Sequence, residues 1–239
     1  MRDTLGKTPI WQAIANALRD DLADGRYVPG DKLPTEAEMA ERFGVNRHTV
    51  RHGIAALVEE GLIRTRRGSG AFVAATPTDY AIGKRVRFHE NLIAAGRRPA
   101  KKVLQIDSRI ATTGEAQALR IAQGAPVCAY HGLSLADGQP VAVVESVFPA
   151  EHLHGIDDAL RLHTSITEAL KTVGISDYTR ASTRLTAVRA SATQALHLHV
   201  AEGDPLLKST SVNVDETGLP IEYGRTWFAG DRVTLTLET

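Results

Sequence analysis

Apolar residues recur at helical spacing in three stretches of the N-terminal third of the chain. The first stretch, residues 9–23, predicts an amphipathic helix, with Pro9 in its first turn and Gly25 just past its end. Its apolar stripe consists of residues that are four apart: Ile10, Ile14, Leu18 and Leu22. We expect this helix to form one side of a small core.

Two shorter helices are predicted to follow, joined by a tight turn at Gly44. Thr35 can cap the first of them, with Glu38 completing a capping box, and Asn46 can cap the second. One face of the second helix is apolar: Val50, Ile54, Leu57 and Val58. Another face is basic and polar: Arg47, His48, Arg51 and His52. The apolar face is therefore expected to pack, and the basic face to point outward.

Residues 62–66 and 71–73 have the composition of two short strands around a glycine-rich tip, which predicts a β-hairpin. Arg64, Arg66 and Arg67 lie beside that tip. Between Met39 and Gly70 the chain has six arginines and three glutamates, although its formal net charge is +0. A locally positive surface is therefore expected, and the neutral total does not argue against DNA as a partner.

The helix pair and the basic hairpin together predict a winged helix-turn-helix whose second helix enters a major groove of DNA. An arginine at the start of such a helix can form two hydrogen bonds with guanine. Arg47 and Arg51 are therefore the first candidates for DNA contact. The alternative is that these arginines are only solvated side chains on the surface of a helix and do not contact DNA.

The sequence LPTEAEMAERFGVNRHTVRHGIAALVEEGLI, followed by RRGSGAFV, resembles the winged helix-turn-helix of GntR-type bacterial transcription factors. We assign residues 1–74 to this DNA-binding domain. The resemblance implies that two parts of the domain contact DNA, the helix pair through Thr35, Asn46, Arg47, His48, Thr49 and Arg51, and the wing through Arg67, Gly68 and Gly70. For His48, a contact with a base, with a phosphate or with neither stays open.

A domain boundary is predicted where the periodicity stops, around Pro77. We take residues 75–86 as a linker and residues 87–239 as a second domain. Basic residues follow with little acidic compensation: Arg85, Arg87, Arg97, Arg98, Lys101 and Lys102. This segment is expected to be a solvated connector, with a path along the DNA backbone as the alternative.

In the second domain, strand-like segments are interrupted by helical ones, which predicts an α+β fold with an antiparallel sheet. Strands are expected at residues 103–112, 127–135, 141–148, 182–189, 206–214, 220–228 and 233–237, the last of which would close the sheet. Helices are expected at residues 114–121, 150–160, 165–173 and 190–198. Asp137 and Gly138 form a strong hairpin signal between two of the strands.

Catalytic, metal and cofactor chemistry is not indicated. The single cysteine, Cys128, permits neither an internal disulfide nor a thiolate zinc site, and it is expected in the core. The histidine pairs 152/154 and 197/199 lack the helical spacing of a zinc site, and no P-loop or dinucleotide fingerprint occurs. No signal peptide and no bilayer-spanning apolar run is present, so we expect a cytoplasmic protein with no membrane partner.

Polar groups of the second domain suit a small anionic, or zwitterionic, ligand. Ser165 can cap a helix whose N-terminus attracts anions, and arginines can bind an acidic group. Glutamates in apolar strands are costly to bury without a partner. The candidate effector-binding residues are Glu145, Ser165, Thr167, Tyr178, Arg180, Arg184 and Glu222.

The sequence ADGQPVAVVES, followed by PIEYGRTWFAGDRVTLTLE, resembles the effector domain of the HutC branch of GntR regulators, the UTRA domain. The resemblance spans roughly residues 88–239. It implies a chorismate lyase-like fold that senses small molecules such as histidine-pathway intermediates or phosphorylated sugars. SITEAL, GISDYTRASTRLTA and EYGRTWFAGDRV are most similar to phosphonate-metabolism regulators of the PhnF type.

One departure from the family pattern concerns the binding of phosphate. Many sugar-phosphate-sensing members carry two arginines on the strand before the ADG turn, where this chain has Gly132 and Ser134. An anion must therefore be held differently here. Four residues are the substitutes that we would test: Arg180, Arg184, Ser165 and Thr167.

Together these features predict a homodimeric repressor, not an enzyme, that binds double-stranded operator DNA. The regulated genes would be those of phosphonate or phosphate uptake and metabolism. A small anionic effector would release the repressor from operator DNA, and this effector is expected to be a phosphonate, phosphate or a phosphorylated metabolite. One alternative is a repressor that responds to a sugar phosphate or another metabolite. A second is an enzyme of the chorismate lyase-like fold joined to a DNA-binding head, and a third is a constitutive DNA-binding protein whose second domain only dimerises.

Overall fold

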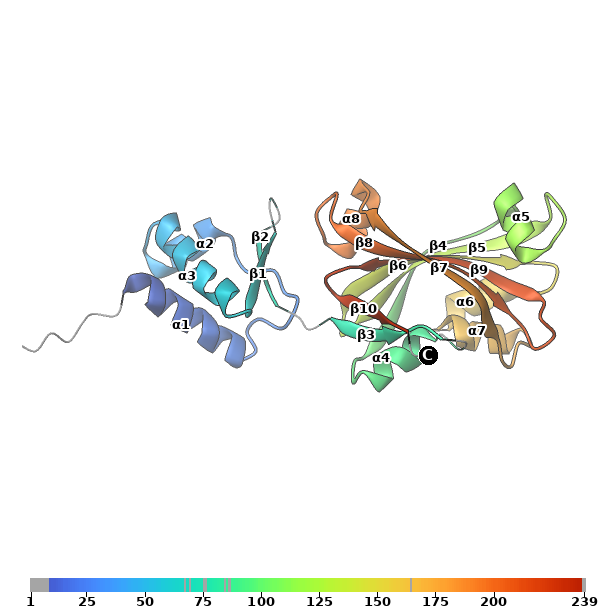
Figure 1. Ribbon diagram of the computed structural model, residues 1–239, viewed down its shortest axis with the longest axis horizontal. Helices are drawn as coiled ribbons and strands as arrows, with labels where there is room; N and C mark the ends of the chain where they lie inside the picture. Colours follow the sequence, from blue (N-terminus) through green and yellow to red (C-terminus); the bar gives the residue numbers. More distant parts are fainter. Residues whose placement is uncertain are drawn as a thin grey trace, which may run out of the picture. The chain divides into compact units, whose positions relative to one another are not determined.

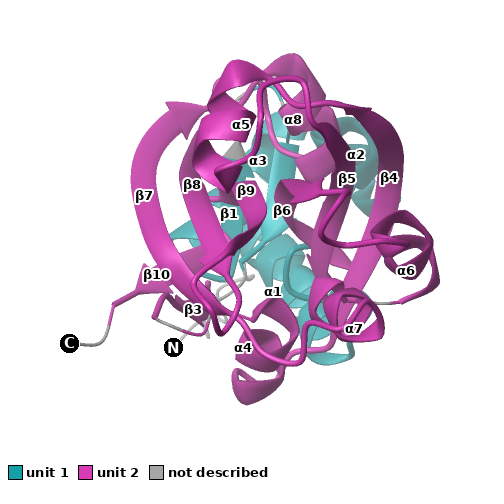
Figure 2. Cartoon of the chain, turned by 90° about the vertical axis from the view of Figure 1, so that its right-hand side faces the viewer, with its two compact units in different colours: residues 1–76 teal, residues 77–239 magenta. Residues whose placement is uncertain are grey.

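A computed structural model describes residues 9–66, 68, 70–74, 77–83, 85, 87–163 and 165–237. The chain divides into two compact units, Met1–Thr76 and Pro77–Thr239, which have different colours in Figure 2. The first unit consists of helices and a small hairpin, and the second is built on a large antiparallel sheet.

The first unit has the order of elements predicted for a winged helix-turn-helix. They are α1 (Ile10–Ala23), α2 (Glu36–Phe43), α3 (Arg47–Glu59), β1 (Ile63–Arg66) and β2 (Gly70–Val73). The apolar faces of the three helices meet in one core that includes Leu18, Met39 and Leu57, each almost completely buried. Burial of these stripes holds the short helices together, since helices of this length are marginal alone.

Local hydrogen bonds set the ends of α2 and α3. The Thr35 hydroxyl accepts the Glu38 N–H at 3.3 Å, and the Glu38 carboxylate accepts the Thr35 N–H at 2.7 Å, so the predicted capping box is present. Gly44 ends α2 in the left-handed conformation, with φ at 64°. The Asn46 side chain then accepts the Thr49 N–H at 2.9 Å and begins α3.

The second unit contains a six-stranded antiparallel sheet in the order β4-β5-β6-β9-β8-β7. Its strands are β4 (Pro99–Ile110), β5 (Pro126–Ala136), β6 (Gln139–Pro149), β7 (Thr179–Arg189), β8 (Pro205–Val214) and β9 (Pro220–Ala229). The helices are α4 (Phe88–Ala94), α5 (Thr113–Leu119), α6 (Ile156–Leu162), α7 (Ile166–Thr172) and α8 (Ala192–Leu198). Helices α5 and α8 lie on one side of the sheet, and α4, α6 and α7 lie on the other (Figure 1). The predicted α+β fold is therefore confirmed.

Three local predictions for this unit were wrong. Residues 233–237 do not close the large sheet, because β10 (Val233–Thr236) pairs in parallel with β3 (Thr78–Ala81) in a separate two-stranded sheet. Strand β3 lies within the predicted linker 75–86, and its pairing makes it part of the second unit. The helix predicted from residue 150 begins only at Ile156, after turns that end at Gly155, whose φ is 77°.

A buried arginine ties distant segments of the second unit together. Arg232 is 5% exposed, and its guanidinium donates hydrogen bonds to the carbonyl oxygens of Pro140, Leu198 and His199. These carbonyls belong to the start of β6 and to the end of α8. Because backbone carbonyl groups accept hydrogen bonds from the buried guanidinium, Arg232 stabilises this arrangement.

A second charged residue, Glu115, is buried at the start of α5. It is 4% exposed and accepts hydrogen bonds from the Arg109 guanidinium at 2.7 and 2.8 Å and from the Thr112 N–H at 2.9 Å. The Arg109 hydrogen bonds, with help from Thr112 and against the effect of burial, lower the pKa of Glu115 to about 2. The ionised carboxylate is therefore part of the folded structure.

We predict that Glu115 makes the unfolding free energy of the second unit depend on pH. Its contribution is present above the ordinary pKa of about 4.5 and is lost as the pH falls towards 2. The substitution Glu115→Gln should lower the unfolding free energy at pH 7 by up to about 3 kcal/mol and flatten its fall below pH 4.5. Denaturant titrations at several pH values measure this, with the exposed Glu202→Gln as control. Equal pH profiles for Glu115→Gln and wild type would contradict the prediction.

Candidate functional site

A shallow hollow on the first unit gathers many of the predicted DNA-binding residues. It lies between α2, α3 and the wing, and the predicted residues that line it are Thr35, Arg47, Arg51, Gly68 and Gly70. Lys32 also lines it, although no sequence pattern singled this residue out. Arg67 lies outside the described residues. The hollow therefore combines both parts of the predicted DNA-contacting surface, the helix pair and the wing.

The two arginines at the start of α3 have different surroundings. The Arg51 guanidinium forms an ion pair with the Glu36 carboxylate, with N···O distances of 2.6 and 3.0 Å, and hydrogen bonding from Arg51 lowers the pKa of Glu36. Arg47 is exposed and forms no hydrogen bond or ion pair with another residue of the described chain. Its guanidinium is therefore open to a ligand, although its charge also acts on the Glu36 carboxylate, whereas the guanidinium of Arg51 is bonded to that carboxylate.

The remaining predicted residues of the helix pair lie around the N-terminus of α3. Asn46 and Thr49 are bonded to each other, since the Asn46 side-chain oxygen accepts from both the Thr49 N–H and its hydroxyl. His48 is exposed one residue into the helix. His52, in contrast, stacks on Trp11 of α1, with ring centroids 4.3 Å apart. His52 is therefore exposed, as expected for the basic face, and it also contributes to packing between α3 and α1.

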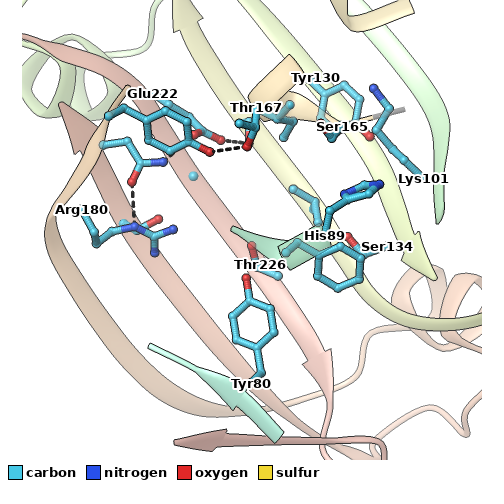
Figure 3. A pocket seen from close by; sticks show the side chains of 18 of the residues that line it. Tyr80, His89, Lys101, Tyr130, Ser134, Ser165, Thr167, Arg180, Glu222 and Thr226 are labelled. Carbon is cyan, nitrogen blue, oxygen red and sulfur yellow. Dashed lines mark hydrogen bonds between the residues drawn. The ribbon is translucent and has the colours of Figure 1, made fainter. Parts of the chain in front are cut away.

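The second unit contains a cavity of about 100 Å³, room for several water molecules. Five of the predicted effector residues line it: Ser165, Thr167, Tyr178, Arg180 and Glu222. Side chains that the sequence did not single out for this role complete much of the wall: Tyr80, His89, Lys101, Tyr130, Ser134 and Asn213 (Figure 3). Residues from α4, α7 and all six strands of the large sheet meet here, although they are far apart in sequence.

Glu145 does not line the cavity, because it lies on the other face of the sheet. On β6, Val144 and Ser146 face the cavity, so side-chain alternation directs Glu145 away from it. There Glu145 forms an ion pair of 2.8 Å with Arg225, its partner in register on β9. Pairing in this way removes the cost of a lone carboxylate among apolar residues.

Arg184 is also absent from the cavity wall, and a β-bulge accounts for this. Arg180 pairs with Asn213, but Ser182 pairs with Val212, so one extra residue lies between them on β7. Residues four apart would share a face on a regular strand, and the bulge reverses that relation. Arg180 therefore lines the cavity, while Arg184 is exposed.

Hydrogen bonds connect the polar residues along one wall of the cavity. Glu222 is 7% exposed and accepts hydrogen bonds from the Ser146 hydroxyl at 2.5 Å and from the Asn213 amide at 2.6 Å. The Asn213 oxygen accepts from Arg180 Nε at 2.7 Å. Beside them, the Thr167 and Tyr178 hydroxyls are hydrogen-bonded at 2.8 Å. The network orients Glu222 and Arg180 side by side.

The basic segment after β3 is not a solvated connector, contrary to the prediction. Arg87 is 9% exposed, forms an ion pair with Asp177, and stacks over the ring of Tyr178 with 4.7 Å between Cζ and the ring centroid. Arg85 pairs with the same Asp177, and these hydrogen bonds lower the pKa of the aspartate. Lys101 lies inside the cavity wall. Several basic side chains of this segment therefore form contacts within the second unit.

Lys101 and His89 form a second basic wall. Lys101 Nζ donates to the Leu160 carbonyl at 2.9 Å and lies 5.4 Å from the centroid of the Tyr130 ring. Burial lowers the pKa of Lys101, and burial together with the Lys101 charge lowers the pKa of His89. Among the described residues, the buried Nε2 atom of His89 has no hydrogen-bond partner. His89 therefore contributes an unsatisfied ring nitrogen to the wall of the cavity.

Tyr130 occupies the space above Gly132, one of the two positions where an arginine clamp is missing. A Cβ atom added at Gly132 would lie 2.0 Å from the Tyr130 hydroxyl oxygen, which is far inside van der Waals contact. Tyr130 is 2% exposed and cannot move aside easily. Ser134, the other position, supplies a hydroxyl to the cavity. The positive charge of the cavity therefore comes from Arg180 and Lys101 instead of this strand.

Other chemistry that the sequence left open is not visible in the described part of the chain. Within it, no group of three or more histidine, cysteine, aspartate or glutamate residues is placed to hold a metal ion. Cys128 is 2% exposed in a core cluster, and burial raises the pKa of its thiol to about 11. No helix of the described residues has the length and apolar character to cross a bilayer.

Comparison with known proteins agrees with both units. Residues 11–73 match the family described as bacterial regulatory proteins, gntR family, and residues 94–234 match the UTRA domain. An uncharacterized HTH-type transcriptional regulator of Rhizobium meliloti is 36% identical, over 96% of this chain and 95% of its own length. The probable transcriptional regulator PhnF of Escherichia coli is 33% identical, over 95% of this chain and 94% of its own.

Solved structures show the same similarity. The crystal structure of PhnF from Mycobacterium smegmatis has a TM-score of 0.66 and 27% identity, and the match covers 94% of this chain and 98% of that one. The match extends over both units, as do the matches to the two relatives. The chain therefore belongs to the GntR family of bacterial transcriptional regulators, in the HutC-type branch that carries a UTRA effector domain.

Proposed function

We propose that this regulator is a repressor that leaves its operator when a small anionic metabolite binds in the cavity of the second unit. The observation that carries the proposal is the cavity itself, in which two basic side chains, Arg180 and Lys101, meet polar groups from five strands. Regulators of this family bind operator DNA. A ligand that has different affinities for the DNA-binding arrangement of the protein and for its released arrangement therefore changes the fraction of operator that is occupied.

For the DNA contact, we propose the surface formed by the start of α3 and the wing. Its residues are Thr35, Asn46, Arg47, His48, Thr49, Arg51, Arg67, Gly68 and Gly70. Support comes from the exposed Arg47, which forms no hydrogen bond or ion pair with another described residue, and from the hollow between α2, α3 and the wing. An exposed arginine at a helix N-terminus can reach base edges, while wing residues contact the backbone.

For the effector, we propose a phosphonate or phosphate compound, and for the regulated genes, those of phosphonate or phosphate uptake and metabolism. The similarity to PhnF of Escherichia coli and of Mycobacterium smegmatis over both units supports this choice. Repression is supported by a relative in Bacillus subtilis, the HTH-type transcriptional repressor NagR, which is 28% identical over 95% of this chain. Arg180, Lys101, Ser165 and Thr167 are the side chains best placed to bind the acidic group.

We further propose that the regulator is a homodimer. A two-fold protein matches a near-palindromic operator, and most soluble oligomers have this symmetry. The edge strands β4 and β7 expose Val103, Ile110 and Leu185, apolar surface that a second copy could cover.

The substitution Arg47→Ala should weaken specific operator binding by about 1–3 kcal/mol, roughly 5- to 150-fold in Kd, if Arg47 reads a base. Fluorescence anisotropy at one fixed salt concentration measures this, because phosphate contacts depend steeply on salt. Arg19→Ala is the matched control, since Arg19 lies on α1 and pairs with Glu60. Unchanged affinity of the Arg47 variant would contradict the proposed contact.

Arg180→Leu should reduce effector-induced release from DNA by about tenfold or more in effector concentration, because a charge-assisted hydrogen bond is lost in a buried site. Arg184→Leu is the control on the same strand, because Arg184 is exposed and outside the cavity. Both variants are titrated with phosphate, methylphosphonate, 2-aminoethylphosphonate and glucosamine 6-phosphate, with thermal unfolding as the test of folding. If only Arg184→Leu lost the response, the cavity would not be the effector site.

Light scattering coupled to size-exclusion chromatography should give a molar mass of twice the chain's 25.8 kDa for the free protein, and that mass plus the mass of one duplex when operator DNA is bound. A mass of one chain at micromolar concentration would contradict the proposed dimer.

A further inference from the structure

The Glu222 carboxylate stands out among the groups that line the cavity. It is 93% buried, and both of its hydrogen bonds come from neutral donors, Ser146 and Asn213. It forms no ion pair with a basic side chain of the described residues. A buried carboxylate without a compensating cation is costly, although each of its oxygens can accept a further hydrogen bond.

Arg180 does not compensate Glu222 directly, because the Asn213 side chain lies between them and bonds to both. Only Nε of Arg180 is engaged, and its two terminal nitrogens form no hydrogen bond with another described residue. An acceptor from a ligand can therefore bind to these nitrogens. One wall of the cavity thus offers a carboxylate and a guanidinium that are close together and not joined.

Lys101 and His89 lie across the cavity from Arg180 and Glu222 (Figure 3). Lys101 donates a hydrogen bond to the Leu160 carbonyl, and the buried Nε2 of His89 has no partner among the described residues. Besides His89, whose pKa is lowered by burial and by the Lys101 charge, the ionisable side chains Arg180, Lys101 and Glu222 give the wall two positive charges and one negative charge. A ligand that compensates all three carries one positive and two negative charges.

We propose that the effector is a small zwitterion, whose ammonium group binds to Glu222 and whose acidic group binds to Arg180 and Lys101. This inference rests on the proposed role of the cavity as the effector site, and it names the class of ligand. An amine-bearing phosphonate at neutral pH has the required charges, one ammonium and a doubly ionised acid. The small volume of the cavity, about 100 Å³, favours a short spacer between the two groups.

A simple anion would not satisfy this site equally well. Phosphate or an alkylphosphonate can bind to Arg180 and Lys101, but it leaves Glu222 without a cation and brings like charge close to it. A neutral hydroxyl group could donate a hydrogen bond to Glu222 but would not compensate its charge. The amine is therefore the group by which this cavity distinguishes a zwitterion from a simple anion.

The test compares 2-aminoethylphosphonate with ethylphosphonate, which has the same carbon chain and no amine. Calorimetry on the full chain measures binding of each compound, and operator release is followed in parallel. Wild type should bind the amine-bearing compound at least about tenfold more tightly than ethylphosphonate. Glu222→Gln should remove most of that preference, because it lowers the affinity for the amine-bearing compound and not for ethylphosphonate. Glu145→Gln, on the opposite face of the sheet, should keep the preference.

The outcomes separate this inference from the proposed function. Equal binding of the two compounds by wild type, or release by phosphate or ethylphosphonate alone, would overturn the zwitterion and leave the effector cavity in place. If neither compound binds, both the zwitterion and the phosphonate assignment are overturned. The wild-type comparison decides the matter even if Glu222→Gln does not fold, which thermal unfolding would show.

Discussion

Side chains of the six-stranded sheet alternate between its two faces, and the second unit depends on this constraint. On one face, Leu133, Val143 and Trp227 pack beneath α8. On the other face, the neighbouring positions Ser134, Val144 and Thr226 line the cavity. Each central strand therefore contributes to a core and to the cavity at once. A shift of one residue in register would exchange the two sets, so the pairing that stabilises the sheet also determines the chemistry of the cavity.

The first unit is organised by more local means. Its capping box, its left-handed glycine and the Asn46 cap involve residues no more than four apart in sequence. They fix the turn between α2 and α3, and the core beneath them fixes the angle at which α3 is presented. The result is that Arg47 is exposed at the beginning of α3, while Arg51 is held by Glu36. Packing and the proposed DNA contact use different faces of the same helix, so they impose few conflicting demands on its sequence.

The cavity shows how a family pattern can be replaced by another solution. Gly132 has no side chain, and the Tyr130 ring fills the space above it. The positively charged residues of the cavity lie on other strands, Arg180 on β7 and Lys101 on β4. Arg87 holds the cavity residue Tyr178 in position by stacking over its ring, and Asp177 holds Arg87 through an ion pair. As the proposed effector site, the cavity would differ from a simple anion site through the buried carboxylate of Glu222.

The sequence by itself determined the family, the winged helix-turn-helix, the α+β class and most of the strands, because these depend on periodicity, caps and turn residues that act over a few positions. It also indicated five residues of the cavity, through polar residues in otherwise apolar segments. Only the tertiary structure decided which candidates lie together. The bulge on β7 separates Arg184 from Arg180, and alternation on β6 directs Glu145 to Arg225. Lys101, His89 and the pairing of β3 with β10 were likewise invisible, because their partners lie far away in sequence and are brought near only by the folding of the whole sheet.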